Sequence, residues 1–217
     1  MKIYFVSGLA ADSRVFKNLR VPGHCEAVFL EWIPPLKNES LPDYALRMAS
    51  AIDTREPFGL VGLSMGGMIV SEIAGRFKPA VLILISSINS SAQLPFYFKA
   101  AGKLRLHRAV PVELVKKAAL VKRRITKETP EEKDILRQII RDSDADFIRW
   151  AMDAILKWKS TGLPAPDVHI HGNRDEVLPI RFTSPTHIIK KGGHLMVMTR
   201  AREINRILEE RLVNVKI

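Results

Sequence analysis

Short apolar segments recur along the chain, and most are apolar at nearly every position instead of alternating with polar residues. They are rich in Val, Ile, Leu and Phe, and they span residues 2–6, 27–32, 58–63, 80–86, 167–172 and 186–190. Strands that are covered on both faces have this pattern, as in a parallel sheet. We therefore predict a mostly parallel sheet of about six strands.

Segments with helical periodicity lie between these strands, at residues 12–19, 40–52, 66–77 and 201–212. In the second of them, Ser40 is placed to cap the helix and Pro42 falls in the first turn, where its missing N–H does no harm. Strand and helix alternate, which is typical of a doubly wound α/β fold with helices on both faces of the sheet.

The alternation is interrupted once, between residues 88 and 162, where the periodicity is helical and no convincing strand occurs. Prolines divide this segment into about four helices: Pro95, Pro111 and Pro130. We predict that residues 88–162 form a helical lid inserted between the fourth and fifth strands. Residues 1–87 and 163–217 would then form the core.

Length and composition agree with one such domain. The chain has 217 residues, and 47% of them are hydrophobic, enough for a full core. Cys25 is the only cysteine, so the sequence offers no intramolecular disulfide and no cysteine-based zinc site. We expect a cytoplasmic protein. No apolar stretch approaches the roughly 18 residues of a membrane helix, so no membrane span is expected.

The net charge of +11 is unevenly distributed. The stretch from Lys99 to Arg124 holds nine basic residues and one acid, a net charge of +8. This is either a solvated helical face or a landing site for anionic substrates, acidic lipid or nucleic acid. The stretch lacks interleaved aromatic residues and any recognisable nucleic-acid-binding module, so no nucleic-acid partner is expected.

One serine stands between glycines in GLSMGG, where the third strand ends and a helical segment begins. A strand that turns directly into a helix strains the residue between them, and residues two places away crowd the turn. Gly62 and Gly66 stand at those two places. We interpret the motif as a nucleophile elbow that holds the Ser64 hydroxyl above the carboxyl edge of the sheet. The alternative is a tight turn in which Ser64 merely caps the helix.

A serine hydroxyl needs a base to act as a nucleophile at neutral pH. His194 follows the last strand and precedes the last helix, so it lies at the same edge as Ser64. We expect His171 to support the loop after the fifth strand. The remaining histidines lie at the start of the last strand, within the fifth strand, or without a matching context: His187, His169, His24 and His107.

The base in turn needs a carboxylate that fixes its tautomer. Asp175 lies in HGNRDEVLP, the loop that leaves the fifth strand. Glu176 is its main competitor, whereas Asp167 opens that strand at the far edge. The alternative role for Asp175 is that of a helix cap or turn residue.

Acyl transfer also needs donors for the developing oxyanion. The backbone N–H of Met65, directly after the serine, is one candidate. The other comes from the loop after the first strand, VSGLAAD, where Gly8 permits a tight turn and the N–H of Leu9 is the expected donor.

These motifs together resemble the α/β-hydrolase superfamily, in particular its small lid-bearing serine hydrolases. The order Ser64, Asp175, His194 is the family's chain order. GLSMGG resembles the elbow, HGNRDEVLP the acid loop, GGHLMVM the histidine loop and SGLAADSRVF the oxyanion segment. The resemblance spans nearly the whole chain outside the predicted lid.

The chain departs from the family pattern in three respects. The usual leading antiparallel hairpin is absent, so the sheet should have six strands instead of eight. Ser7 stands where the family has a histidine before Gly8, which puts the support of the oxyanion loop in question. Residues 176–193 form a short connection, in which we expect the usual helix to be reduced to a loop.

The resemblance implies a serine hydrolase that cleaves a carboxylic ester or a related acyl bond of a small molecule. Thioesters, lactones and activated carbon–carbon bonds suit the same constellation, and the basic stretch leaves an anionic substrate as one of the alternatives. No metal or organic cofactor is required. Aromatic residues at the start of the predicted lid either line an apolar acyl pocket or form the lid's own core: Phe96, Tyr97 and Phe98. The alternative function is a non-catalytic ligand-binding protein on the same scaffold. The sequence leaves the oligomeric state open.

Overall fold

A computed structural model of the chain describes residues 1–104, 110–122 and 129–215. The described strands are β1 (Lys2–Val6), β2 (Glu26–Leu30), β3 (Phe58–Leu63), β4 (Val81–Ile85), β5 (Val168–Gly172) and β6 (His187–Ile189). They form a six-stranded sheet in the order β2-β1-β3-β4-β5-β6, and every neighbouring pair is parallel. The predicted sheet is therefore confirmed, and all its strands end at the same edge.

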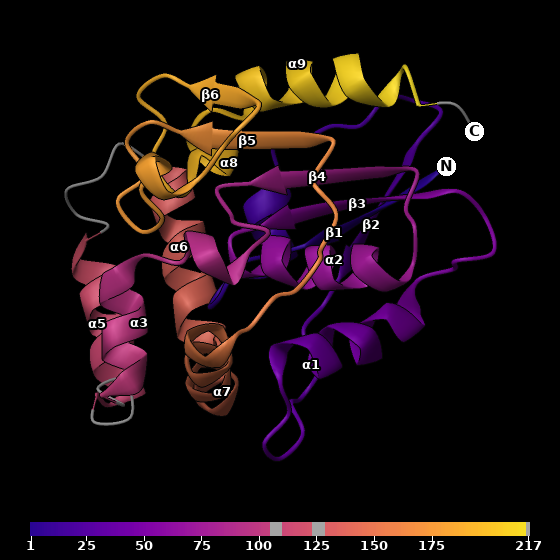
Figure 1. The fold of residues 1–217 in the computed structure, drawn as a ribbon. Helices are drawn as coiled ribbons and strands as arrows, with labels where there is room; N and C mark the ends of the chain where they lie inside the picture. Colours follow the sequence, from indigo (N-terminus) through magenta and orange to yellow (C-terminus); the bar gives the residue numbers. More distant parts are fainter. Residues whose placement is uncertain (105–109, 123–128, 216–217) are drawn as a thin grey trace.

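Helices cover both faces of the sheet (Figure 1). One face carries α1 (Leu41–Met48) and α2 (Met65–Arg76), and the other carries α8 (Met196–Thr199) and α9 (Ala201–Leu212). Every residue of β3 and β4 is buried, which explains why these strands are apolar throughout. The edge strand β2 is mostly exposed or half-buried.

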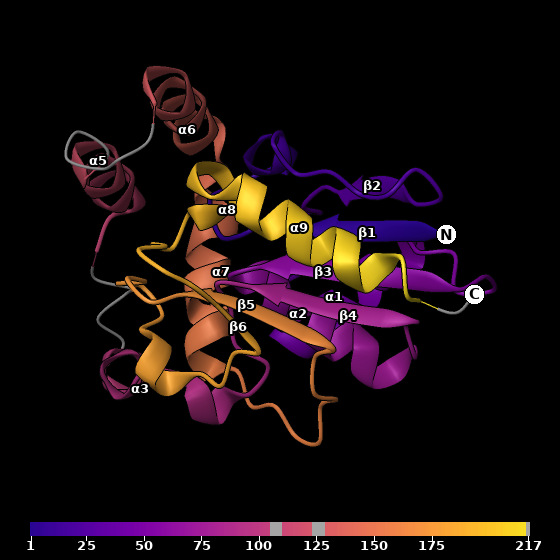
Figure 2. The same cartoon turned by 90° about the horizontal axis from the view of Figure 1, so that it is seen from above.

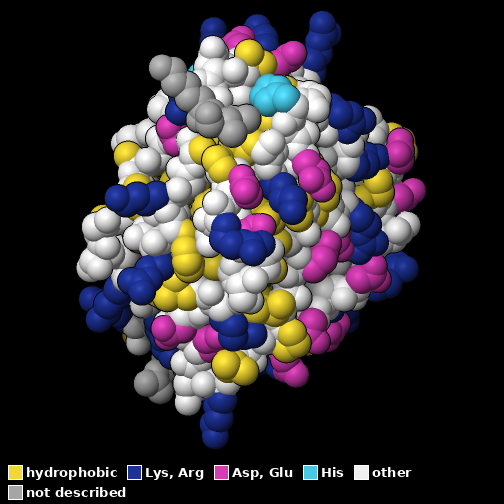
Figure 3. Space-filling model, turned by 90° about the vertical axis from the view of Figure 1, so that its right-hand side faces the viewer, with side chains coloured by type: hydrophobic (Ala, Val, Ile, Leu, Met, Phe, Trp, Pro, Cys, Tyr) yellow, Lys and Arg dark blue, Asp and Glu magenta, His cyan; other side chains and the backbone are white. Residues whose placement is uncertain are grey.

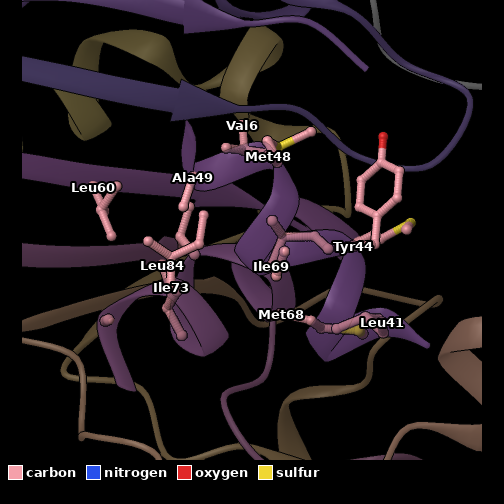
Figure 4. Close-up of a cluster of buried hydrophobic side chains, with 14 of the residues drawn as sticks. Val6, Leu41, Tyr44, Met48, Ala49, Leu60, Met68, Ile69, Ile73 and Leu84 are labelled. Carbon is pink, nitrogen blue, oxygen red and sulfur yellow. The ribbon is translucent and has the colours of Figure 1, made fainter. Parts of the chain in front are cut away.

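Side chains along each central strand alternate between the two helical layers. Tyr4 and Val6 of β1 pack in the cluster with α1 and α2, whereas Ile3 and Phe5 pack in the cluster with α9. Figure 4 shows part of the first cluster, in which strand side chains meet those of both helices. The hydroxyl of Tyr44 there points away from the apolar side chains, and it bonds both the backbone N–H and the carbonyl of Ile33.

The segment between β4 and β5 contains the described helices α3 (Phe96–Lys103), α5 (Val112–Lys122), α6 (Pro130–Asp142) and α7 (Ala145–Lys157). The three prolines stand at the beginnings of α3, α5 and α6, as predicted. These helices gather at the carboxyl ends of the strands (Figures 1 and 2). Helix α7 contacts α1, α3 and α5, and it buries Phe147, Ile148, Ala151 and Ala154. Thus α7 joins this segment to the rest of the fold.

One predicted element differs from the structure, and a further set of residues is not described by it. The helix predicted over 12–19 is wrong, because the chain forms only a 3-10 turn, η1 (Ser13–Phe16), that buries the adjacent Val15 and Phe16 together. Several residues singled out in the sequence lie outside the described part of the chain: Arg105, His107, Arg108, Arg123 and Arg124.

The surface at the opposite end from α3 and α5, where both termini lie, mixes basic and acidic side chains (Figure 3). The described helices include none that is both long enough and apolar enough to cross a lipid bilayer.

Candidate active site

Ser64 occupies the single position between the end of β3 and the start of α2. Its backbone has φ 53° and ψ −120°, a region that residues with a side chain rarely adopt. Such strain persists where the surrounding structure enforces it. The Ser64 side chain makes no capping hydrogen bond to α2. Its role is therefore not that of a helix cap, which was the alternative interpretation of the motif.

The two glycines of the motif are required by close backbone contacts. A Cβ atom on Gly62 would lie 2.5 Å from the carbonyl oxygen of Gly66, and one on Gly66 would lie 2.2 Å from the carbonyl oxygens of Val6 and Ser7. Backbone atoms in the centre of a packed sheet have no room to yield to such an overlap. The elbow can therefore form only with glycine at both positions.

His194 and Asp175 join Ser64 at the carboxyl edge of the sheet. His194 Nε2 lies 2.9 Å from Ser64 Oγ, and its Nδ1 lies 2.8 Å from Asp175 Oδ2. The Asp175 side chain is fully buried, and that of His194 is 15% exposed. The carboxylate only accepts hydrogen bonds, so the proton of a neutral His194 resides on Nδ1 and leaves Nε2 free to accept from the serine hydroxyl.

The surroundings of Asp175 favour its ionised form. Burial acts to raise its pKa, but hydrogen bonds from His171, His194 and the backbone N–H of Leu178 together outweigh it, and the pKa lies below the usual range. Its Oδ1 accepts from the N–H groups of Val177 and Leu178 at 2.9 and 2.8 Å. The carboxylate is thus charged at neutral pH and fixed in orientation.

The loops that carry the acid and the histidine are bound to each other. Arg174 N–H donates to the carbonyl of Gly192 at 2.9 Å, and Lys191 N–H donates to the Asn173 side chain at 2.7 Å. A Cβ atom on Gly172 would approach the Gly192 carbonyl oxygen to 2.2 Å. In the intervening chain, the described structure has the short 3-10 turn η4 (Ile180–Phe182), so the expected loss of a full helix is confirmed.

The two expected oxyanion donors belong to segments that adjoin the serine. Met65 is the first residue of α2, and its N–H has no partner within the helix. Leu9 follows Gly8, and a Cβ atom on Gly8 would be 3.2 Å from Ser64 Cβ, so the loop after β1 directly abuts the serine. Within the described residues, neither N–H donates a backbone hydrogen bond. Both N–H groups therefore stay the predicted oxyanion donors.

The competing residues lie elsewhere or have other partners. Asp167 is at the opposite edge, where it accepts from the N–H of Leu82 and pairs with Arg211. His187 bonds the neighbouring Thr186, and His24 lies near the carbonyl of Leu212. Glu176 follows Asp175, and its Oε2 would lie 3.7 Å from a Cβ atom on Gly193. Asp175 is the carboxylate that is hydrogen-bonded to the imidazole, 2.8 Å from His194 Nδ1.

A buried hydrogen-bonded chain behind the site was missed by sequence reasoning. The Ser87 hydroxyl donates to the carbonyl of Ser64 at 2.5 Å, and the Ser87 carbonyl lies 3.0 Å from His169 Nε2. His169 Nε2 is 3.3 Å from His171 Nδ1, and His171 Nε2 is 2.7 Å from the Leu178 carbonyl and 3.3 Å from Asp175 Oδ2. The contacts thus run from the serine backbone round to the acid.

The signal for this chain is the His-x-His spacing in β5, which places both imidazoles on one face of a strand. His171 contacts the acid loop, as we expected from its position. Burial, followed by the neighbouring His171, lowers the pKa of His169 to about 4, although the carbonyls of Ser87 and Ser184 oppose the shift. His169 is therefore neutral at neutral pH.

The three aromatic residues at the start of α3 have different environments. Phe96 and Tyr97 are 69% and 37% exposed, whereas Phe98 packs against the cluster that contains α2. The Tyr97 ring lies 6.3 Å from the ring of Phe182 in η4. Only Phe98 of the three therefore belongs to the packed interior.

Comparison with known proteins identifies the family of the chain. A sequence model described as the alpha/beta hydrolase family matches residues 3–207. The chain is 25% identical to a pimeloyl-(acyl-carrier protein) methyl ester esterase of Neisseria meningitidis serogroup A, in an alignment that covers 92% of this chain and 70% of that protein.

Two solved structures share the fold. A thermophilic esterase from Thermogutta terrifontis aligns with 100% of this chain and 91% of its own, with a TM-score of 0.68 and 19% identity. An enol-lactonase from Burkholderia xenovorans LB400 aligns with 98% of this chain and 91% of its own, with a TM-score of 0.69 and 13% identity. At these identities the likeness concerns the fold alone.

Proposed function

The chain belongs to the alpha/beta hydrolase family, and on this premise we propose that it hydrolyses carboxylic esters of small molecules through an acyl-enzyme on Ser64. The observation that carries the proposal is the continuous contact from Ser64 Oγ to His194 and from His194 to the buried Asp175. A nucleophile, a base and an orienting acid in this order suit acyl transfer.

In the first half of the proposed reaction, Ser64 Oγ attacks the carbonyl carbon of the ester while its proton passes to His194 Nε2. The carbonyl oxygen becomes an oxyanion, which accepts hydrogen bonds from the N–H groups of Met65 and Leu9. Asp175, which is ionised, stabilises the imidazolium that forms. The carbon–oxygen bond to the alcohol then breaks, and His194 gives its proton to the departing alcohol.

In the second half, water replaces the alcohol. His194 removes a proton from the water as its oxygen attacks the acyl carbon, and the same two N–H groups receive the second oxyanion. The acid product leaves when the bond to Ser64 Oγ breaks and His194 returns the proton to the serine. None of these steps draws on a metal or an organic cofactor.

We further propose that residues 88–162 act as a lid and contribute to the acyl site. The support is the position of the described helices α3, α5, α6 and α7 at the carboxyl edge of the sheet (Figure 2) and the packing of Phe98 against the cluster that contains α2. Phe96 and Tyr97, which are exposed, are available to a long acyl chain. Replacing Phe96 and Tyr97 by alanine should therefore change the preferred acyl length without abolishing turnover.

An anionic ester is the substrate class that the described lysines favour. Lys99, Lys103 and Lys117 are exposed on α3 and α5; Lys99 donates to the carbonyl of Ala92, and Lys116 donates to that of Ser143. The N. meningitidis relative carries the name of an esterase for a methyl ester on an acyl-carrier protein. Methyl esters of long acyl chains that end in a charged group are thus the first substrates to try. We retain the cytoplasm as the predicted compartment because Cys25 has no cysteine partner.

A turnover screen tests the proposed function. The panel contains aryl esters of graded acyl length, methyl esters, acyl-CoA thioesters and lactones, and it is run with wild type, Ser64→Ala and the matched control Ser50→Ala. Ser50 is exposed in the 3-10 turn that follows α1, and its hydroxyl donates to the carbonyl of Arg47. We expect ester turnover by wild type and Ser50→Ala and its loss in Ser64→Ala. Equal turnover in Ser64→Ala, or ligand binding with no turnover of any member, would overturn the proposal.

A further inference from the structure

The loop that presents Leu9 is a tight and strained turn. Ala11 N–H donates to the Gly8 carbonyl at 3.0 Å, which closes a turn over residues 8–11. Ala10 in this turn has φ 54°, a left-handed conformation that a residue with a Cβ atom adopts at a cost. Such a turn is held by its surroundings, and the position of the Leu9 N–H depends on what holds it.

The carbonyl oxygen of Ala11 is held by two donors from different parts of the chain. The buried Ser7 hydroxyl donates to it at 2.9 Å, and the indole Nε1–H of Trp32 donates to it at 2.7 Å. A carbonyl oxygen has two lone pairs, so both donors can be accepted together. Ser7 is the residue that replaces the family's usual histidine, and Trp32 supplies a second attachment from the loop after β2.

On the side that faces Trp32 the loop is not close-packed, so packing alone does not hold it there. A cavity of about 630 Å³ lies there, and its lining includes Ala10, Ala11, Trp32 and Phe147. On the other side the loop abuts the elbow, because a Cβ atom on Gly66 would lie 2.2 Å from the Ser7 carbonyl oxygen. The loop is thus close-packed against α2, whereas toward the cavity it depends on the hydrogen bond from Trp32.

Trp32 also connects this loop to α7. Its ring centroid lies 4.8 Å from that of Phe147, a buried residue in the first turn of α7, and 6.3 Å from that of Tyr44 in α1. The indole, and with it the direction of its N–H, thus packs against both α7 and α1.

We propose that Trp32, together with Ser7, is a positioning residue that fixes the Leu9 N–H for the oxyanion and ties this donor to α7. The inference rests on the proposed function, since it concerns the same reaction. Trp32 touches no reacting atom in this scheme, because it acts through the Ala11 carbonyl. A displacement of the order of 1 Å in a group that stabilises a transition state costs up to about 100-fold in rate.

The test compares Trp32→Phe with Trp150→Phe. Phenylalanine keeps an aromatic ring at each position but lacks the indole N–H. Trp150 belongs to the same aromatic cluster: its ring centroid lies 4.3 Å from that of Tyr44 and 5.5 Å from that of Phe147. Its Nε1–H donates to the carbonyl of Glu39 at 2.9 Å. Trp150→Phe therefore removes one indole hydrogen bond from the same aromatic cluster without touching the oxyanion loop, and it serves as the matched control.

We expect Trp32→Phe to lower kcat about tenfold with little change in KM, and the double variant with Ser7→Ala to lower it about 100-fold. A trifluoromethyl ketone analogue of the substrate adds Ser64 Oγ to its carbonyl carbon, with the serine proton moving to His194 and an oxyanion left on the ketone oxygen. The affinity of these variants for the ketone should fall in parallel with kcat. The pH profile of kcat/KM should keep its midpoints, because the contacts of His194 are untouched. Trp150→Phe should resemble wild type in every readout.

The inference is overturned if an active wild type and Trp32→Phe have equal kcat and equal affinity for the ketone, or if Trp150→Phe shows the same losses. If Trp32→Phe does not fold, Ser7→Ala carries the test, with Ser7→Thr as the conservative variant that restores the hydroxyl and should restore kcat. A folded Ser7→Ala variant with wild-type kcat then overturns it. An inactive wild type with no labelling of Ser64 would overturn the proposed function itself, and the inference with it.

Discussion

Acidification should destabilise the fold through His169, a buried histidine two residues before His171 in β5. The residue is 2% exposed, and burial lowers its pKa to about 4 from the ordinary value of 6.5. In the unfolded chain the imidazole therefore takes up its proton at a higher pH than in the folded protein. Its stabilising contribution is fully present above pH 6.5 and is lost as the pH falls toward 4.

The size of the effect follows from the difference between the two pKa values. A difference of one pKa unit corresponds to about 1.4 kcal/mol, so the full loss from His169 is about 3 kcal/mol at strongly acidic pH. Between pH 7.5 and pH 5 the same relation gives a loss of about 2 kcal/mol in the free energy of unfolding. That is a large part of the stability of an ordinary domain.

The perturbation that isolates this contribution is His169→Gln, because glutamine keeps an N–H donor for the Ser87 carbonyl but does not titrate. Urea unfolding at pH 7.5 and pH 5 gives the free energy of unfolding for each protein. Wild type should lose about 2 kcal/mol more than His169→Gln over this interval. The exposed His24→Gln variant should lose as much as wild type. Equal losses in wild type and His169→Gln would refute the reasoning.

Three further predictions follow from the site. Gly66→Ala should lower the free energy of unfolding by about 3 kcal/mol or more, because its Cβ atom would meet backbone carbonyl oxygens at 2.2 Å; an unchanged urea midpoint would contradict this. Asp175→Asn should fold and lose about 10⁴-fold in kcat, whereas Glu176→Gln should keep it; the reverse result in ester assays would reassign the acid. Lys103→Gln/Lys117→Gln should lower kcat/KM for an anionic ester at low salt but not for a matched neutral ester, and the difference should fade at high salt; identical salt profiles for both esters would leave these lysines as a solvated face.

The sheet was predictable because its signal is local. Segments such as 80–86 are apolar at successive positions and are short. Such a run is typical of a strand that is buried on both faces of a sheet. The turn at Ser64 could be predicted for a similar reason. Where two backbone segments approach closely only glycine fits, so the crowded positions are visible in the sequence as glycines. The helix predicted over 12–19 failed because the apolar residues there pack in a single 3-10 turn.

The supporting contacts could not be read from the sequence. Trp32 reaches the Ala11 carbonyl from 21 positions away, and the Ser87 hydroxyl reaches the Ser64 carbonyl from 23 positions away. Such a contact joins a side chain to a backbone atom, and any residue at the accepting position offers the same carbonyl. The identity of the accepting residue therefore gives no sign of the contact, which is visible only in the folded structure.

The central claim is that Ser64 is a nucleophile activated by His194, and covalent labelling tests it most directly. Wild type, Ser64→Ala and His194→Ala are treated with a fluorophosphonate, and the modified peptide is identified by mass spectrometry. Attack of Ser64 Oγ on phosphorus expels fluoride, and the serine proton passes to His194. The account predicts a label on Ser64 in wild type, no label in Ser64→Ala, and a loss of labelling rate of about 10⁴-fold or more in His194→Ala. Labelling at another residue that persists in Ser64→Ala, or an undiminished rate in His194→Ala, would contradict it.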